Sequence, residues 1–99
     1  MLIRVVTMTF EESKVDEFLQ LFDGHKNKIR NFPGCDYLEL WRDINQKNVI
    51  YTYSHWINKE ALENYRCSPL FEEVWPKTKR LFKEKAQAFS VEKSLKVDP

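Results

Sequence analysis

The chain has 99 residues, of which 42% are hydrophobic and 14% aromatic, and its formal net charge is +1 at neutral pH. A charge this close to zero provides no field for nucleic acid or for an anionic membrane surface, so neither is an expected partner. The length suits one domain, residues 1–99, and large aromatic side chains concentrate in cores, in interfaces and in pockets for flat apolar ligands.

No segment has the pattern of a signal peptide or a membrane span, because the apolar N-terminal stretch is short and carries Arg4. The two cysteines, Cys35 and Cys67, have no neighbouring metal-ligand pattern. We therefore expect a cytoplasmic protein with reduced thiols and no bound metal.

The chain begins with a predicted strand and a predicted helix. Residues 2–10, LIRVVTMTF, are rich in β-branched and apolar types. Ser13 and Asp16 form a candidate capping box for the helix, and Phe32-Pro33-Gly34 ends it, because proline disfavours helix in the residue before it. The inward stripe of this helix consists of Val15, Phe18, Leu19, Phe22, His25 and Ile29.

Two further strands are expected at residues 35–42 and 48–56. The residues between them are polar and turn-forming, which predicts a hairpin. Asn58 is a candidate N-cap for the helix that follows, which carries Leu62 and Tyr65.

The stretch from Tyr65 to Phe82 predicts a break and then another helix. Ser68 is the candidate N-cap and Pro69 suits the first helical position, where its missing N–H has no cost. Apolar spacing continues the helix to Phe82, with a kink expected at Pro76. Residues 86–95 predict the last strand, and the chain ends loosely.

The order β-α-β-β-α-β is that of the ferredoxin-like α+β fold, an antiparallel sheet with its helices on one face. The other face is also apolar, since Ile3 and Val5 of the first strand point away from Leu2, Val6 and Met8. No helix is left to cover that face, so we expect a symmetric homodimer packed through the sheet.

Four short motifs carry a family resemblance. They are Phe32-Pro33-Gly34-Cys35, Tyr53-Ser54-His55-Trp56, Leu62-Glu63-Asn64-Tyr65 and Ser68-Pro69-Leu70-Phe71. In these motifs and their order the chain resembles the antibiotic biosynthesis monooxygenase (ABM) domain. The resemblance implies a dimeric α/β barrel with a pocket between helices and sheet in each subunit. It also implies oxidation of quinol-like or polyphenolic substrates by O2 with no metal or flavin, the electrons coming from the substrate.

A branch of the same superfamily that degrades haem looks similar through the second helix. Its iron-ligating histidine corresponds to Trp75 here, and one of its tryptophans corresponds to Tyr65. Because tryptophan cannot ligate iron, the comparison implies no haem, and we expect no cofactor.

The candidate site combines a base with aromatic walls. His25 is the candidate proton acceptor, because it shares the inward stripe and an imidazole titrates near neutral pH. The alternative is a histidine at the edge of the core, hydrogen-bonded to a backbone carbonyl. The candidate substrate-binding walls are Phe22, Trp56, Tyr65, Phe71 and Trp75. For these aromatic residues the alternative is plain core packing.

Two further polar residues have open roles. Glu39 lies on a strand face with aromatic neighbours, where burial would raise its pKa and let it act as an acid or base; alternatively it pairs with Arg4 or Arg42. His55 is either a site residue or a residue that faces the dimer interface or the solvent.

We predict a cofactor-free monooxygenase that oxidises a small aromatic or quinol-like substrate with O2. One alternative is a dimeric small-molecule-binding protein without catalysis. Another is a mutarotase-like isomerase, since that group resembles the chain in a first-helix histidine and second-helix tryptophans.

Overall fold

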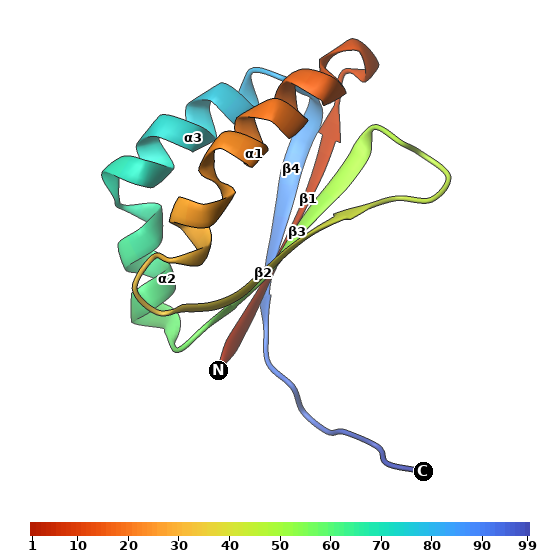
Figure 1. Cartoon of the computed structure of the whole chain (residues 1–99). Helices are drawn as coiled ribbons and strands as arrows, with labels where there is room; N and C mark the ends of the chain where they lie inside the picture. The colour runs from red at the N-terminus through yellow and green to blue at the C-terminus, as the bar shows by residue number, and fades with distance from the viewer.

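Four antiparallel strands form one sheet in the order β2-β3-β1-β4 in the computed structural model, which describes all 99 residues (Figure 1). The strands are β1 (Leu2–Phe10), β2 (Cys35–Arg42), β3 (Val49–Trp56) and β4 (Phe82–Val91). β1 and β3 pair at the centre, from Leu2 opposite Trp56 to Thr9 opposite Val49. The predicted ferredoxin-like α+β architecture is confirmed, and so is the β2–β3 hairpin.

The helices all lie on one face of this sheet (Figure 1). They are the short 3₁₀ helix η1 (Glu12–Lys14) and the α-helices α1 (Val15–Arg30), α2 (Lys59–Arg66) and α3 (Pro69–Lys79). Asn58 Oδ1 accepts from the Ala61 amide at 2.8 Å and Ser68 Oγ accepts from the Phe71 amide at 3.2 Å, which confirms both predicted caps. None of these helices combines the length and the apolar composition that crossing a membrane requires.

The predicted capping box of α1 is wrong. Ser13 lies inside η1, and the N-cap of α1 is Lys14, which makes no capping hydrogen bond with its side chain. The reason is the way the chain leaves β1. The Lys14 amide already donates to the Glu11 carbonyl at 2.8 Å, so a 3₁₀ turn occupies the position where Ser13 and Asp16 would have met.

The boundary between α3 and β4 differs from the prediction. α3 ends at Lys79, and β4 begins at Phe82, four residues before the predicted start of the strand at Ala86, and ends at Val91. Pairing with β1 explains the difference, because Phe82 lies opposite Phe10 at the far end of β1. Strand pairing along the length of β1 therefore overrides the helical spacing of the apolar residues.

The turn after α1 depends on a glycine. Gly34 has a φ of +91°, and a Cβ at this position would overlap Ala61 of α2. The Ile57 amide donates to the Gly34 carbonyl at 2.9 Å, which ties the turn to the end of β3. Gly34 thus permits both the turn and the close approach of α2.

The buried side chains form two separate clusters between the helices and the sheet. The first contains Met8, Phe10, Val15, Phe18, Ile50 and Leu81. The second contains Cys35, Trp56, Ala61 and Leu62, beside α2. The division of the core matters for function, because side chains of both clusters border the cavity described below.

The opposite face of the sheet carries no helix (Figure 1). Exposed aromatic side chains gather there, including Tyr37 and Trp41 of β2, which are 39% and 42% exposed. Trp41 stacks on Tyr53 of β3 with ring centroids 4.4 Å apart, and Tyr37 contacts the ring of His55 at 5.0 Å. We call this uncovered surface the outer face.

Glu39 lies on the outer face and pairs with neither predicted arginine. It accepts hydrogen bonds from the Tyr37 hydroxyl and, at 2.8 Å, from Trp41 Nε1. These bonds, the one from Tyr37 first, lower the pKa of the Glu39 carboxyl, so the expected rise is wrong. Strand alternation gives the reason, because it places Arg4 on the helix side and leaves Glu39 exposed.

Candidate functional site

An apolar cavity of about 240 Å³ lies between the helices and the sheet. Met8 and Phe18 of the first core cluster border it, as do Trp56 and Leu62 of the second. Engineered apolar cavities of about 150 Å³ hold a benzene molecule. This cavity therefore has room for a single ring or a small fused ring system.

One wall of the cavity is a run of aromatic rings from β3, α2 and α3. Trp56 stacks on Tyr65 with centroids 5.0 Å apart, Tyr65 meets Phe71 edge-on at 5.2 Å, and Phe71 stacks on Trp75 at 5.6 Å. Phe22 of α1 lines the same cavity. The structure thus brings all five residues predicted to bind substrate to one cavity, while their role in binding stays a prediction.

Local sequence explains why these rings face the cavity. The Ser68 cap and Pro69 fix the start of α3, and Phe71 and Trp75 follow four residues apart on one face of the helix. Trp56 is held by a hydrogen bond from its Nε1 to Ser54 Oγ at 2.9 Å and is only 1% exposed. The wall is therefore rigid at its β3 end.

The Tyr65 hydroxyl is the polar group of this wall. Burial, and to a smaller extent the Cys35 thiol, raises the pKa of Tyr65 to about 12, and no hydrogen bond contributes to the shift. The phenol is therefore neutral at physiological pH. It can donate a hydrogen bond to an oxygen of a bound molecule.

The other polar lining groups are hydroxyls and guanidinium groups. They belong to Arg4, Thr52, Ser54, Arg66 and Thr78. The Thr78 hydroxyl donates to the Val74 carbonyl at 2.9 Å, and the Ser54 hydroxyl accepts a hydrogen bond from Trp56 Nε1. No histidine, carboxylate, lysine or cysteine lines the cavity, so the lining offers donors and positive charge but no ordinary general base.

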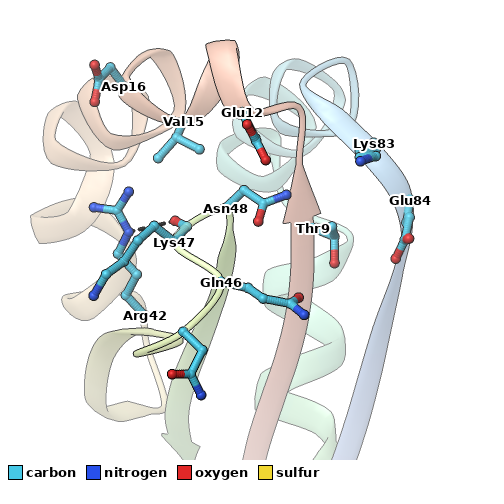
Figure 2. Close-up of a pocket in the computed structure, with 11 residues that line it drawn as sticks. Thr9, Glu12, Val15, Asp16, Arg42, Gln46, Lys47, Asn48, Lys83 and Glu84 are labelled. Atoms are coloured by element: carbon cyan, nitrogen blue, oxygen red, sulfur yellow. Dashed lines mark hydrogen bonds between the residues drawn. The ribbon is translucent and has the colours of Figure 1, made fainter.

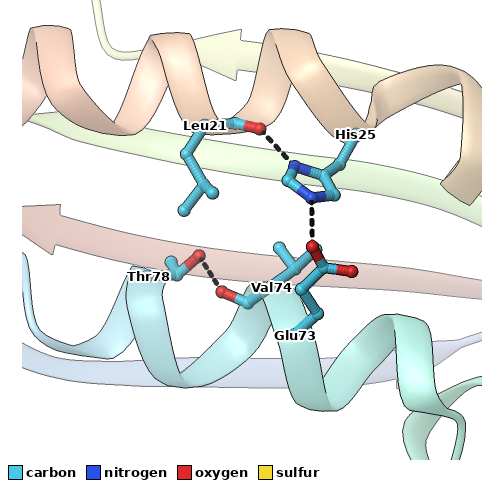
Figure 3. Close-up of polar contacts among 5 residues, drawn as sticks. All are labelled: Leu21, His25, Glu73, Val74 and Thr78. Atoms are coloured by element: carbon cyan, nitrogen blue, oxygen red, sulfur yellow. Dashed lines mark hydrogen bonds and ion pairs between the residues drawn. The ribbon is translucent and has the colours of Figure 1, made fainter.

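His25 lies outside the cavity, between α1 and α3 (Figure 3). Its Nδ1 is 2.8 Å from the Leu21 carbonyl oxygen and its Nε2 is 3.4 Å from Glu73 Oε1. A carbonyl can only accept, so Nδ1 carries a proton, and Nε2 donates to the Glu73 carboxylate only when the ring is doubly protonated. The hydrogen bond from His25 lowers the pKa of the Glu73 carboxyl. These contacts match the alternative of a histidine at the core edge. The role of proton acceptor stays a prediction that this geometry does not support.

Two arginines line the cavity, and they are close enough for the charge of Arg66 to lower the pKa of Arg4. Arg4 comes from β1 and Arg66 from the last turn of α2. Neither arginine is among the site residues predicted from the sequence. The available signal was strand alternation, which puts Arg4 on the face of Val6 and Met8. The approach of Arg66 depends on the packing of α2 and has no local signal.

A second hollow lies at the other end of the sheet, near the β2–β3 turn (Figure 2). Only one of its 11 lining residues is hydrophobic. Charges of both signs surround it, with Lys83 and Glu84 extending from β4 while Arg42 Nε donates to the Lys47 carbonyl at 2.7 Å. These groups do not converge on one point, which is typical of a solvated surface.

The chain has clear likenesses to known proteins. The family model described as antibiotic biosynthesis monooxygenase (ABM) matches residues 1–76. Among curated proteins no significant match is found.

Solved structures share the fold over nearly the whole chain. One described as an antibiotic biosynthesis monooxygenase has a TM-score of 0.90 at 17% identity, covering 96% of this chain and 100% of that one. A conserved protein from Methanosarcina mazei Go1 has a TM-score of 0.88 at 19% identity, covering 95% and 94%. Rv0793 from Mycobacterium tuberculosis has a TM-score of 0.87 at 12% identity, covering 98% of each chain. Likenesses at such low identity establish the fold.

Proposed function

Because the chain belongs to the antibiotic biosynthesis monooxygenase family, we propose that it is a cofactor-free monooxygenase that oxidises a small aromatic or quinol-like substrate with O2. The observation that carries the proposal is the aromatic wall, since stacked rings bind a flat substrate and exclude water from it. For a quinol, the reaction converts the quinol and O2 to a hydroxyquinone and water. All the electrons come from the substrate.

The chain's own residues position the ring and stabilise charge on it. Trp56, Phe71 and Trp75 contact the ring faces, with Phe22 closing the α1 side. Tyr65, neutral because its pKa is about 12, donates a hydrogen bond to the substrate oxygen that becomes anionic when its proton leaves. A donor aimed at developing charge lowers the barrier more than it strengthens ground-state binding.

A dimeric binding protein without catalysis is the second candidate. The observation that favours it is the lining, which contains no histidine or carboxylate, together with the position of His25 outside the cavity. The mostly apolar lining gives no support to a mutarotase-like isomerase, because opening a sugar ring requires an acid and a base near the hydroxyls.

Oxygen uptake by metal-stripped protein tests the two candidates against each other. The substrates are hydroquinones and naphthols, and the variants are Tyr65→Phe, His25→Ala and the control Tyr51→Phe, since Tyr51 does not line the cavity. We expect saturable uptake whose kcat falls by about a hundredfold in Tyr65→Phe, as for the loss of one oxyanion donor. Loss of turnover in His25→Ala with unchanged binding and melting temperature would restore His25 as the base.

Failure has a distinct signature in the same experiment. If no substrate supports uptake while tryptophan fluorescence still responds to the compounds, the chain binds rings without oxidising them. The binding protein is then the correct assignment.

We also propose that a second copy of the chain covers the outer face. Tyr37 and Trp41 are too exposed there for a stable apolar surface, and Phe89 of β4 is 49% exposed on the same sheet. Sedimentation at micromolar concentration should give a dimer, and Trp41→Glu should give a monomer near 12.0 kDa. A wild-type monomer would refute this.

The free thiols of Cys35 and Cys67 agree with a cytoplasmic location.

A further inference from the structure

The positive end of the cavity has more charge than it has counter-charge. Arg4 is half-buried, and its Nη1 donates to the neutral Ser90 hydroxyl at 2.8 Å. No ion pair of the structure includes Arg4. Arg66, 47% exposed, pairs with Glu63 at 3.3 Å. Two guanidinium groups therefore share a single carboxylate beside an apolar cavity.

A half-buried guanidinium without a direct ion pair is unfavourable, because it has lost part of its hydration and has only the carboxylate that it shares with Arg66 nearby. Burial and then the charge of Arg66 lower the pKa of Arg4, and the charge of Glu63, the smallest of the three effects, raises it. A bound anion would offset the repulsion between the guanidinium groups of Arg4 and Arg66. Guanidinium groups present several N–H donors in a plane that suits a carboxylate in particular.

The register of the sheet places this charge relative to the aromatic wall. Arg4 lies opposite Ser54 in β3, and the Ser54 hydroxyl accepts a hydrogen bond from Trp56 Nε1. Arg66 directly follows Tyr65. Because Trp56 and Tyr65 line the same cavity as the two arginines, an acid group bound by the arginines leaves room for the attached ring against these two aromatic residues.

We propose that the cavity binds a flat aromatic molecule carrying a carboxylate, with the carboxylate between Arg4 and Arg66 and the ring on the aromatic wall. This inference rests on the proposed function in one respect, since it concerns the ligand of the same cavity. It adds the chemical class of that ligand and two residues that determine specificity. It does not require turnover.

Binding of an acid and its neutral isostere tests the inference. The probes are 2-naphthoate and 2-naphthamide, which share a ring and differ in charge, measured by calorimetry and tryptophan fluorescence at low salt. The variants are Arg4→Gln and Arg66→Gln. The control is Arg80→Gln, which removes one positive charge at an exposed position that does not line the cavity. Melting temperatures verify that each variant folds.

The expected results separate local from long-range charge. Naphthoate should bind at least about tenfold more tightly than naphthamide, and each cavity variant should lose about tenfold for naphthoate alone. Arg80→Gln should change neither affinity, and added salt should weaken only naphthoate binding. Glu63→Gln should raise the naphthoate affinity about twofold or more, because it frees Arg66 from its partner. This last variant keeps the test decisive if Arg4→Gln fails to fold.

Other outcomes overturn the inference. Equal affinity for the two probes would refute the carboxylate while leaving a ring-binding cavity and the proposed monooxygenase intact. An equal loss in Arg80→Gln would show that only net charge matters. If neither probe binds and no quinol supports oxygen uptake, the cavity has no ligand of this kind and the proposed function fails as well.

Discussion

The ionisation of Tyr65 links the cavity wall to the stability of the whole protein. Burial raises the pKa of Tyr65 from 10.0 to about 12 in the folded state. As the pH rises, the unfolded chain releases this proton first, so deprotonation favours unfolding. The stabilising contribution is fully present below pH 10 and is lost as the pH rises through 12.

The magnitude follows from the two pKa values. A shift of about two units corresponds to about 2.7 kcal/mol in total, of which about 1.4 kcal/mol is lost by pH 11. Tyr65→Phe removes the ionisable group and keeps the ring. Since no hydrogen bond contributes to the shift of this hydroxyl, the variant should cost less than about 1 kcal/mol at pH 8.

Urea unfolding of the two proteins between pH 8 and pH 11 measures the effect. Between pH 8 and pH 11, the free energy of unfolding of the wild type should fall by about 1.4 kcal/mol more than that of Tyr65→Phe. The pKa of Tyr37 is also raised, by its hydrogen bond to Glu39, but Tyr37 is present in both proteins and its effect cancels. Parallel loss of stability in the two proteins up to pH 11 would refute the burial of the Tyr65 hydroxyl.

Four further substitutions test the cavity wall, the two glycines and the α3 cap. Trp75→Ala should lower the free energy of unfolding by about 2–3 kcal/mol, because it removes a half-buried ring from the wall. It should also reduce the fluorescence response to aromatic ligands to the part that Trp56 contributes, and an unchanged ligand response would contradict the assigned site. Gly34→Ala should destabilise the protein by about 2 kcal/mol or more, since φ is +91° and the new Cβ would overlap Ala61, whereas Gly24→Ala should stabilise it by about 0.5–1 kcal/mol, having nothing within 4 Å; thermal melts that show equal effects would contradict the described turn. Ser68→Ala should cost about 1 kcal/mol in urea unfolding through the lost α3 cap, and no loss would mean that the cap contributes little.

Much of the fold was predictable because it is encoded locally. The strand at residues 35–42 was predicted with its observed bounds, and the caps at Asn58 and Ser68 lie where predicted. A cap depends on residues within one turn, and strand alternation on each second residue, so neither requires knowledge of distant contacts. The four-residue spacing of Phe71 and Trp75 likewise identified the cavity wall.

Contacts between distant segments decided the rest. The start of β4 at Phe82 depends on pairing with β1, and the helical spacing of the same residues could not reveal it. His25 follows the inward stripe of α1, yet the approach of α3 sets Glu73 beside it and leaves it outside the cavity. Glu39 is different, because its partners Tyr37 and Trp41 lie two residues away on its own strand; what the sequence did not show is that no helix covers this face.

The sequence by itself thus determined the element order, the sheet with one uncovered face and the aromatic residues of the wall, because propensity, capping and periodicity act over a few residues. Only the tertiary structure brought Arg4 of β1 and Arg66 of α2 to the lining of one cavity and separated the core into two clusters. Which charged side chains line the cavity depends on how α2 packs on the sheet, and no local sequence pattern predicts that packing.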